Sequence, residues 1–321
     1  MFDILPGTLY HWYRDHISDY HSDKRSANWP DASIMDVDED TGEIFKEQPV
    51  PILKPENICE QMCIDDKAIG HDGYTILSDT RTGKIAMMIE STKSEELEAA
   101  LSIFGDELEK VKSISCDMSP TYLKLCREKF PKAETVIDKF HVMQYLYDAV
   151  LDVRSRIKKK LAEGLSKGKK KTDKDKEILR EMDLLKRCRL RLTQSAQKWS
   201  EQTTELMKQI FSKYKELKTV YDLSQDFKNW YDRNNCLKDK TWIQESLYLW
   251  YNKVKEANLE EMMPVVKMIR KHEDNIINYF TAAHTNAKAE SLNGKIQRFV
   301  AANYGVKNKD FALYRIAGYF S

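Results

Sequence analysis

Residues 58–90 read ICEQMCIDDKAIGHDGYTILSDTRTGKIAMMIE. Three runs rich in apolar and β-branched residues, at 58–64, 74–78 and 84–90, are separated here by short turns that contain glycine and aspartate. Runs of this length with such turns between them are typical of consecutive antiparallel strands. The stretch therefore predicts a three-stranded meander at the start of a folded core.

The residues that follow alternate between helical and strand patterns. We expect a helix from Ser94 to about Phe104, a strand over 111–116, a helix from Pro120 and a strand over 133–137. A meander followed by such crossovers gives an α/β fold, with a mixed five-stranded sheet in the order 3-2-1-4-5 flanked by helices. A doubly wound parallel fold fits less well, because no glycine-rich phosphate loop follows the first strand.

The rest of the chain divides by composition. Residues 145–280 are expected to be almost wholly helical, because they contain few glycines and a single proline. Residues 22–57 are rich in Asp, Glu, Ser and Pro, and this favours a linker or irregular arm. We therefore expect an acidic N-terminal arm (1–57), the first part of an α/β core (58–150), a basic all-α insertion (151–280) and the closing helices of the core (281–321).

The 321 residues carry 52 basic and 51 acidic side chains, but the two signs are unevenly distributed. Residues 1–66 hold 15 acidic and 5 basic side chains, whereas residues 153–218 hold 21 basic and 9 acidic ones. The basic segment indicates binding to a polyanion such as nucleic acid, or else the solvated face of lysine-rich helices.

Several protein classes are excluded. The apolar runs are far shorter than the roughly 20 residues that span a bilayer, and the N-terminus lacks the pattern of a signal peptide. The six cysteines form no Cys-x-x-Cys pair and lie at no zinc-finger spacing from a histidine. We expect a soluble, intracellular protein with free cysteines and no zinc site.

Three carboxylates lie at positions where they could bind metal ions together, two at strand ends and one on a late helix. Asp65 follows the first expected strand, and Asp117 follows the fourth, its parallel neighbour in the expected order. Two carboxylates held this close repel each other unless a cation lies between them, and oxygen ligands suit Mg²⁺ or Mn²⁺. Glu290, on a late helix, is the candidate for the third ligand of a two-metal site that cleaves phosphodiesters. Taken singly, each of these acids is more often a turn, cap or solvated residue.

Four blocks of sequence, in this order, carry a family resemblance: CIDD (63–66), SCDMSPTY (115–122), DKFHV (138–142) and NAKAESLN (286–293). Together they closely resemble the catalytic region of the DDE transposases of bacterial insertion sequences, in the ISL3 group. The resemblance covers residues 58–150 and 281–321. It implies a ribonuclease H-like fold with Asp65, Asp117 and Glu290 as the catalytic and metal-binding triad.

Other residues match the family's pattern as accessory positions. Asp138 and His141 correspond to its D-x-x-H signature, although His141 could equally be a packing histidine. Asn286 and Asn293 share a helix face with Glu290, where they would orient its carboxylate or contact DNA. Asp66 stands where family members tend to have Glu, so no role is carried over to it.

The resemblance implies an enzyme that uses two Mg²⁺ or Mn²⁺ ions to cut DNA at the ends of a mobile element and to join the freed 3′-hydroxyl to target DNA. The expected DNA-binding residues are Arg154, Arg156, Lys158, Lys159, Lys160, Lys169, Lys170, Lys171, Arg187, Lys288 and Lys295. For Lys288 and Lys295 the alternative is a solvated lysine that contacts no DNA. Four of the six tryptophans lie in the insertion, at Trp199, Trp230, Trp242 and Trp250. Core positions are expected for them, with stacking of one on a flipped base as the alternative.

Relatives usually carry a zinc-binding element and a helix-turn-helix before the core, and residues 1–57 show neither. We therefore expect weak intrinsic recognition of element ends, with a separately encoded helix-turn-helix protein or the basic insertion supplying it. Synapsis of two ends implies a homo-oligomer on DNA. We expect the protein to be cytoplasmic and associated with the nucleoid, with no membrane partner. The alternatives are a ribonuclease H-like structure-selective nuclease or resolvase and a domesticated, non-catalytic DNA-binding protein. A purely structural helical scaffold leaves the ordered acidic blocks unexplained.

Overall fold

The computed structural model describes residues 6–18, 20, 33–37, 44–49, 52–166, 172–234, 239–282, 287–302 and 309–320. The chain forms two compact units, the first made of Met1–Val136 with Ala282–Ser321 and the second of Ile137–Thr281. None of the helices within the described ranges is long and apolar enough to cross a membrane.

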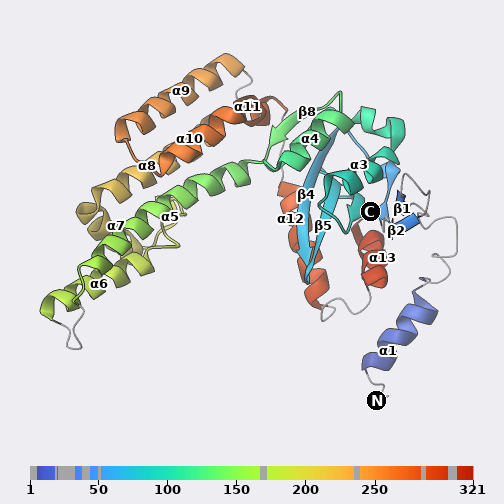
Figure 1. The fold of residues 1–321 in the computed structure, drawn as a ribbon, viewed down its shortest axis with the longest axis horizontal. Coiled ribbons are helices and arrows are strands. Elements are labelled where there is room, and N and C mark those ends of the chain that lie inside the picture. Colours follow the sequence, from blue (N-terminus) through green and yellow to red (C-terminus); the bar gives the residue numbers. More distant parts are fainter. Residues whose placement is uncertain are drawn as a thin grey trace. The chain divides into compact units, whose positions relative to one another are not determined.

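A six-stranded mixed sheet is the centre of the first unit (Figure 1). Its strands, in spatial order, are β3 (Ile52–Leu53), β6 (Ile85–Ile89), β5 (Asp72–Asp79), β4 (Gln61–Ile69), β7 (Ser113–Cys116) and β8 (Glu134–Ile137). β4, β5 and β6 form the predicted antiparallel meander, and β4 and β7 are parallel neighbours. The five predicted strands keep their predicted neighbours. The observed order differs in one detail, because an additional strand, β3, pairs with the outer edge of β6.

Residues 22–57 contain regular structure, so their interpretation as an irregular arm is wrong in part. β1 (Ser33–Val37) and β2 (Ile44–Pro49) form an antiparallel hairpin, and β3 pairs with β6 through Ile52 and Met88. Ile52 is only 1% exposed. Burial of this one side chain at the edge of the sheet stabilises a strand that the acidic, proline-rich composition concealed.

Helices cover both faces of the sheet (Figure 1). Ile76 packs in a buried cluster with side chains of α12 (Ala287–Ala302) and α13 (Lys309–Phe320). The hydroxyl of the preceding residue, Thr75, is hydrogen-bonded to the hydroxyl of Tyr122 at 3.0 Å. Tyr122 belongs to α4 (Pro120–Lys129). Because successive strand residues point to opposite faces, α12 and α13 lie on one face and α4 on the other.

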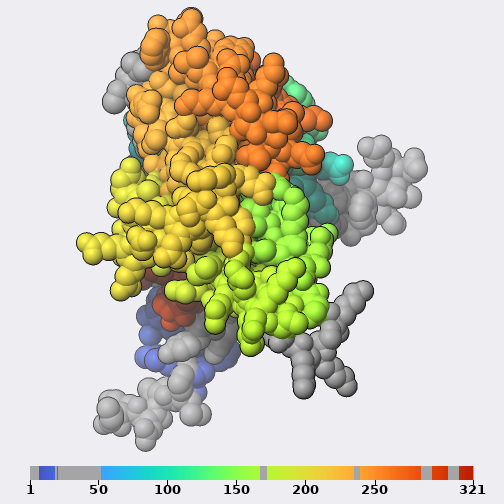
Figure 2. Space-filling view, turned by 90° about the vertical axis from the view of Figure 1, so that its left-hand side faces the viewer, coloured from blue at the N-terminus to red at the C-terminus, as the bar shows by residue number. Residues whose placement is uncertain are grey.

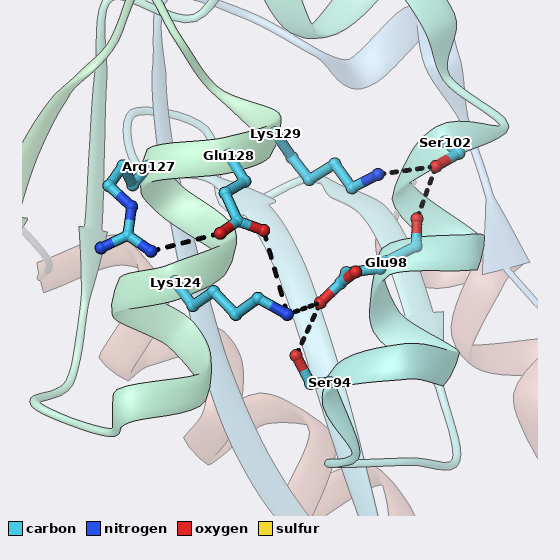
Figure 3. A network of polar contacts seen from close by, with 7 residues as sticks. All are labelled: Ser94, Glu98, Ser102, Lys124, Arg127, Glu128 and Lys129. Atoms are coloured by element: carbon cyan, nitrogen blue, oxygen red, sulfur yellow. Dashed lines mark hydrogen bonds and ion pairs between the residues drawn. The ribbon is translucent and has the colours of Figure 1, made fainter.

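A polar network ties α4 to α3 (Ser94–Ser102) on their exposed side (Figure 3). Lys124 Nζ lies 2.7 Å from Glu98 Oε1, which also accepts a hydrogen bond from Ser94 Oγ at 2.7 Å. Lys129 Nζ donates to Ser102 Oγ at 2.9 Å. Exposed pairs of this kind contribute about 0–1 kcal/mol each, so the network orients α4 more than it stabilises the fold.

The N-terminal segment packs against α13. α1 (Pro6–Trp12) continues as a π-helical turn over Tyr13–Ile17. The rings of Tyr10 and Phe311 meet edge to face, with centroids 5.8 Å apart. This contact attaches the start of the chain to the first unit.

Helices make up the regular structure of the second unit, as predicted for residues 145–280. They are α5 (Lys139–Glu163), α6 (Asp173–Arg187), α7 (Glu201–Lys213), α8 (Lys215–Asn234), α9 (Lys240–Ala257), α10 (Met262–Lys271) and α11 (Glu273–Thr281). Residue 150, where the sequence analysis divides core from insertion, falls inside α5. The second unit instead begins at Ile137, because α5 is one continuous helix that starts directly after β8.

Two arginines of α5 hold helices of this unit together. Arg156 donates to Glu261 Oε1 at 2.5 Å and to Glu216 Oε2 at 2.9 Å, which connects α5 with α8 and with the residue before α10. Arg154 donates to the carbonyl oxygen of Leu185 at 3.2 Å, and burial lowers the pKa of its guanidinium. Both side chains, predicted to bind DNA, therefore have partners within the protein.

Asp175 fastens together the residues on either side of the basic loop 167–171, which itself lies outside the described residues. Its carboxylate accepts hydrogen bonds from the backbone N and hydroxyl of Ser166 (2.8 and 2.6 Å) and from those of Thr172 (2.8 and 2.9 Å). Thr172 and Asp175 form a capping box at the start of α6. These hydrogen bonds, above all those from Ser166, hold the pKa of Asp175 well below its usual range.

The substitution Asp175→Asn is expected to lower the midpoint of thermal unfolding at about pH 7, because the amide loses the charge and one acceptor oxygen. Since the pKa of Asp175 is depressed by folding, its contribution to stability is present above the unfolded value near 3.8. It is lost as the pH falls below that value towards the folded pKa. Circular dichroism should therefore show a difference in midpoint that is largest near neutral pH and shrinks below about pH 3.8.

Asp173→Asn is the matched control, because the Asp173 side chain is 98% exposed in the same first turn of α6. Its effect should be smaller at every pH. A deficit in the Asp175 variant that stays constant through the acid range would contradict the assignment.

Candidate active site

Asp65 lies inside β4 rather than after it. β7 pairs only with the first three residues of β4, 61–63. Beyond them β4 continues as a hairpin with β5, in which Asp65 is opposite Ile76. The prediction that the strand ends at residue 64 is therefore wrong, because hairpin pairing extends the strand past the point where β7 stops.

Asp117 directly follows β7, as predicted. The parallel register pairs Cys63 with Ser115. Asp65 and Asp117 thus stand at equivalent positions, each two residues beyond this pair, Asp65 within β4 and Asp117 directly after β7. Alternate strand residues share a face, so both aspartates lie on the face that α12 covers. Both side chains are half-buried.

Local hydrogen bonds orient the two carboxylates. Asp117 Oδ1 accepts from the backbone N of Ser119 at 2.7 Å, and Ser119 is the residue before α4, whose first position is Pro120. Asp65 Oδ1 accepts from the backbone N of Asp66 at 2.9 Å. The turn into α4 thus holds Asp117, while the backbone of β4 itself holds Asp65.

Asn293 of α12 contributes the long-range contact of the site. Its Nδ2 donates to Asp65 Oδ2 at 2.7 Å, although the two residues are 228 positions apart. Leu292 and Ile296, both fully buried, pack the same helix into the sheet core. The contact shows that the Asn293 face of α12 meets β4 at Asp65.

Glu290 lies on α12 three residues before Asn293, about one turn away on the same side of the helix. The side chains of Glu290 and Lys288, and all of Asn286, lie outside the described residues. The structure therefore brings the backbone of α12 to the site, and the place of the Glu290 carboxylate stays a prediction.

Tyr122 is a residue whose part in the site the sequence analysis missed. Its hydroxyl bonds to Thr75, whose Oγ1 donates to the carbonyl oxygen of Ser91 at 2.6 Å. Burial raises the pKa of Tyr122, and the charges of Asp66 and Asp117 act in the same direction. The hydrogen bond of this neutral phenol with Thr75 connects α4 to β5. The signal was present, since Tyr122 ends the SCDMSPTY block.

Three buried cysteines lie in the core near Asp117. Cys63, Cys116 and Cys126 are each at most 4% exposed. A hydrogen bond with Cys126, together with burial, raises the pKa of Cys116 well above its ordinary value. Cys116 therefore stays protonated, and all three cysteines serve as small apolar residues of the core.

A family model of the ISL3-type DDE transposases, described as "Transposase", matches residues 62–316. The chain belongs to this family. No curated protein and no solved structure matches it. The match begins in β4, ends in α13 and includes the whole helical unit, so Asp65, Asp117 and Glu290 all lie within the matched residues. Membership makes this chain one of the transposases, which are enzymes that bind and process DNA.

The D-x-x-H residues of this transposase lie in the second unit. Asp138 is the N-cap of α5, and its Oδ1 accepts from the backbone N of Phe140 at 2.9 Å. His141 is half-buried in the first turn, with its ring 5.6 Å from that of Phe140. Helix capping accounts for an aspartate at position 138. A catalytic part for either residue stays a prediction.

The predicted DNA-binding residues of the transposase fall into four groups. Arg154 and Arg156 have the internal partners described above, and Lys169, Lys170, Lys171 and Lys288 have no described side chains. Lys158 is half-buried. The exposed ones are Lys159, Lys160, Arg187 and Lys295.

The donor chemistry of the site fits a hard cation. Among the residues with described side chains, no three His, Cys, Asp or Glu form a group that could hold a metal ion. Asp65 and Asp117 nevertheless supply carboxylate oxygens at equivalent positions of neighbouring parallel strands. Such oxygens are the ligands that Mg²⁺ and Mn²⁺ prefer, and a third ligand has to come from outside this set.

Proposed function

We propose that this transposase cuts DNA at the ends of an insertion sequence and transfers the strand to target DNA, using Asp65, Asp117 and Glu290 with two Mg²⁺ or Mn²⁺ ions. The parallel register of β4 and β7 carries the proposal, because it sets the two aspartates side by side in a chain of this family. The approach of α12 to Asp65 through Asn293 supports Glu290 as the third ligand.

The residues of the chain prepare the site for phosphoryl transfer. Divalent ions, when bound, would lower the pKa of an attacking water and neutralise charge on the phosphate. Asp65 is oriented by Asn293 and by its own strand, and Asp117 by the turn at Ser119. Ligands held in this way need little rearrangement when phosphate arrives, and such preorganisation is what the reaction depends on.

We also propose a ribonuclease H-like fold for the first unit. The five strands β6-β5-β4-β7-β8, in this order and with helices on both faces, support it. Glu290 follows the helical unit in the chain, so the catalytic core would be interrupted by an insertion. A homo-oligomer on paired DNA ends, and a separate helix-turn-helix protein that reads those ends, complete the proposal.

Contacts to the DNA backbone are assigned to exposed cations, most of them in the helical unit. Lys159 and Lys160 lie near the end of α5, and Arg187 ends α6. The basic loop 167–171 follows α5 in the sequence, and Asp175 holds the residues that flank it. Lys295 of α12 is exposed in the first unit.

Asp117→Ala should lower the rate of Mg²⁺-dependent nicking of a terminal-repeat substrate by about a hundredfold or more and leave DNA binding intact. Asp106→Ala, which alters an exposed aspartate on the first unit, is the control and should cut normally. Normal cutting by the Asp117 variant would show the triad to be misassigned. Pre-cleaved ends that the wild type fails to join to target DNA would indicate a structure-selective nuclease instead.

Asn293→Leu should lower cleavage by about 10–100-fold, because Asp65 loses the partner that orients it. The defect should be partly restored at higher Mg²⁺ concentration, which a general folding defect would not produce. Gln297→Leu, at an exposed position of the same helix, is the matched control. An unchanged Mg²⁺ dependence in the Asn293 variant would rule out a positioning role.

Joint replacement of Lys159, Lys160 and Arg187 by alanine should weaken DNA binding and flatten its salt dependence. Each lost phosphate contact lowers the slope of log K against log salt by about 0.9, so the fall should be about 2–3. The control triple replaces Lys110, Lys112 and Lys132, exposed lysines that are paired with glutamates on the first unit. Equal slopes for the two triple variants would refute the assignment.

A further inference from the structure

The chain between α6 and α7 of the second unit forms a basic turn over residues 188–192. Around it, residues 184–200 carry no acidic side chain and five basic ones, Lys186, Arg187, Arg189, Arg191 and Lys198. Figure 2 looks onto this unit, and the stretch from α6 to α7, yellow-green to yellow, is part of the surface that faces the viewer. Leu190, between two of the arginines, is 70% exposed, more than any other large apolar side chain that the structure describes.

Buried residues at both ends anchor the turn. Cys188 and Leu192 are fully buried. The carbonyl oxygen of Cys188 accepts hydrogen bonds from the backbone N of Arg191 at 2.9 Å and from that of Leu192 at 3.1 Å. Thr193 Oγ1 donates to the carbonyl oxygen of Leu190 at 3.2 Å. The backbone is therefore held in place at the residue that carries the exposed side chain.

Aromatic side chains attach the turn to the rest of the unit. The indole nitrogen of Trp199 donates to the carbonyl oxygen of Arg191 at 3.2 Å. The hydroxyl of Tyr221, in α8, donates to the carbonyl oxygen of Gln194 at 2.9 Å. The rings of Trp199 and Tyr221 lie with their centroids 5.4 Å apart. A leucine on a backbone held in this way loses little further conformational freedom when it enters a partner.

The arginines around Leu190 keep their charge available to an anion. Arg187, Arg189 and Arg191 are exposed, and within the described part of the chain none of them forms an ion pair with a carboxylate. Arg191 donates to the neutral carboxamide of Gln194 at 3.2 Å. The positive charge of the turn therefore favours a polyanionic partner.

A single leucine between arginines fits duplex DNA. The core of a protein interface is depleted of charged residues, so this turn is a poor candidate for one. Unpaired bases are held by stacking on aromatic rings, and residues 186–191 include none. Proteins that kink duplex DNA, in contrast, insert an aliphatic or other apolar side chain between base pairs while basic side chains contact the minor groove.

We propose that the turn 188–192 is a wedge that bends the duplex DNA bound by this transposase. Leu190 inserts between two base pairs from the minor groove, and Arg189 and Arg191 contact the DNA on either side of it. Pyrimidine–purine steps such as TA are the expected sites, because they unstack most easily. The inference rests on the proposed function for the presence of DNA. Insertion needs neither metal ions nor cleavage, and every residue involved belongs to the second unit.

The test uses the full chain and a terminal-repeat duplex of about 30 base pairs, which is short enough to be stiff when free. Donor and acceptor dyes at its two ends report bending as a rise in energy transfer, and EDTA prevents cleavage. Saturating wild-type protein should bend the duplex by about 20–90°. Leu190→Ala should lose most of this bend while still binding, whereas Leu190→Met should keep it, because a long apolar side chain is retained.

Met263→Ala is the matched control, since Met263 is a 62% exposed apolar residue on α10 of the same unit. It should bend the duplex like the wild type. Joint replacement of Arg189 and Arg191 by alanine should weaken binding and lower the slope of log K against log salt by about 2.

A wild-type complex without a bend, or equal bends with the wild type and Leu190→Ala, would overturn the proposal. An equal loss of bending in the Met263 variant would do the same. A loss of affinity for single-stranded DNA in Leu190→Ala, as large as that for the duplex, would point to contact with unpaired bases and would refute insertion. Asp117→Ala should bend the duplex like the wild type, so failure of the catalytic proposal and failure of the wedge give different results.

Discussion

The parallel pairing of β4 with β7 is the constraint on which the rest of the site depends. Its register, fixed by pairs such as Cys63 with Ser115, sets Asp65 and Asp117 at equivalent positions on one face of the sheet. β4 is a central strand with a neighbour on each side, so this register is held by the meander as well as by β7. A slip of one residue would carry an aspartate to the opposite face, where α4 packs.

The second requirement is the return of the chain to the same face after the helical unit. Asn293 reaches Asp65 across 228 positions of sequence, and Leu292 and Ile296 bury the helix that carries it. Packing of the core thus brings Asp65 together with the helix that carries Glu290, whereas the exposed cations Lys159, Lys160 and Arg187 lie in the helical unit.

Much of the fold followed from local patterns. The meander, the crossover strands and the helical character of residues 145–280 were predicted, because each depends on periodicity and turn residues within a short window. β3 was missed, since a two-residue strand has no periodicity and exists only because Ile52 pairs with Met88 at the sheet edge. The extension of β4 was missed for a similar reason, since its end depends on how far β5 accompanies it.

The sequence by itself determined the family of the chain, because the blocks around Asp65 and Asp117 are recognisable without coordinates. Only the tertiary structure decided which members of a residue type are exposed and which are buried or paired within the protein. It showed Arg156 bound by two glutamates, and it buried Trp230 while leaving Trp242 exposed. The physical reason is that side-chain type is a local property, whereas burial and pairing depend on surfaces that meet only when distant segments pack together.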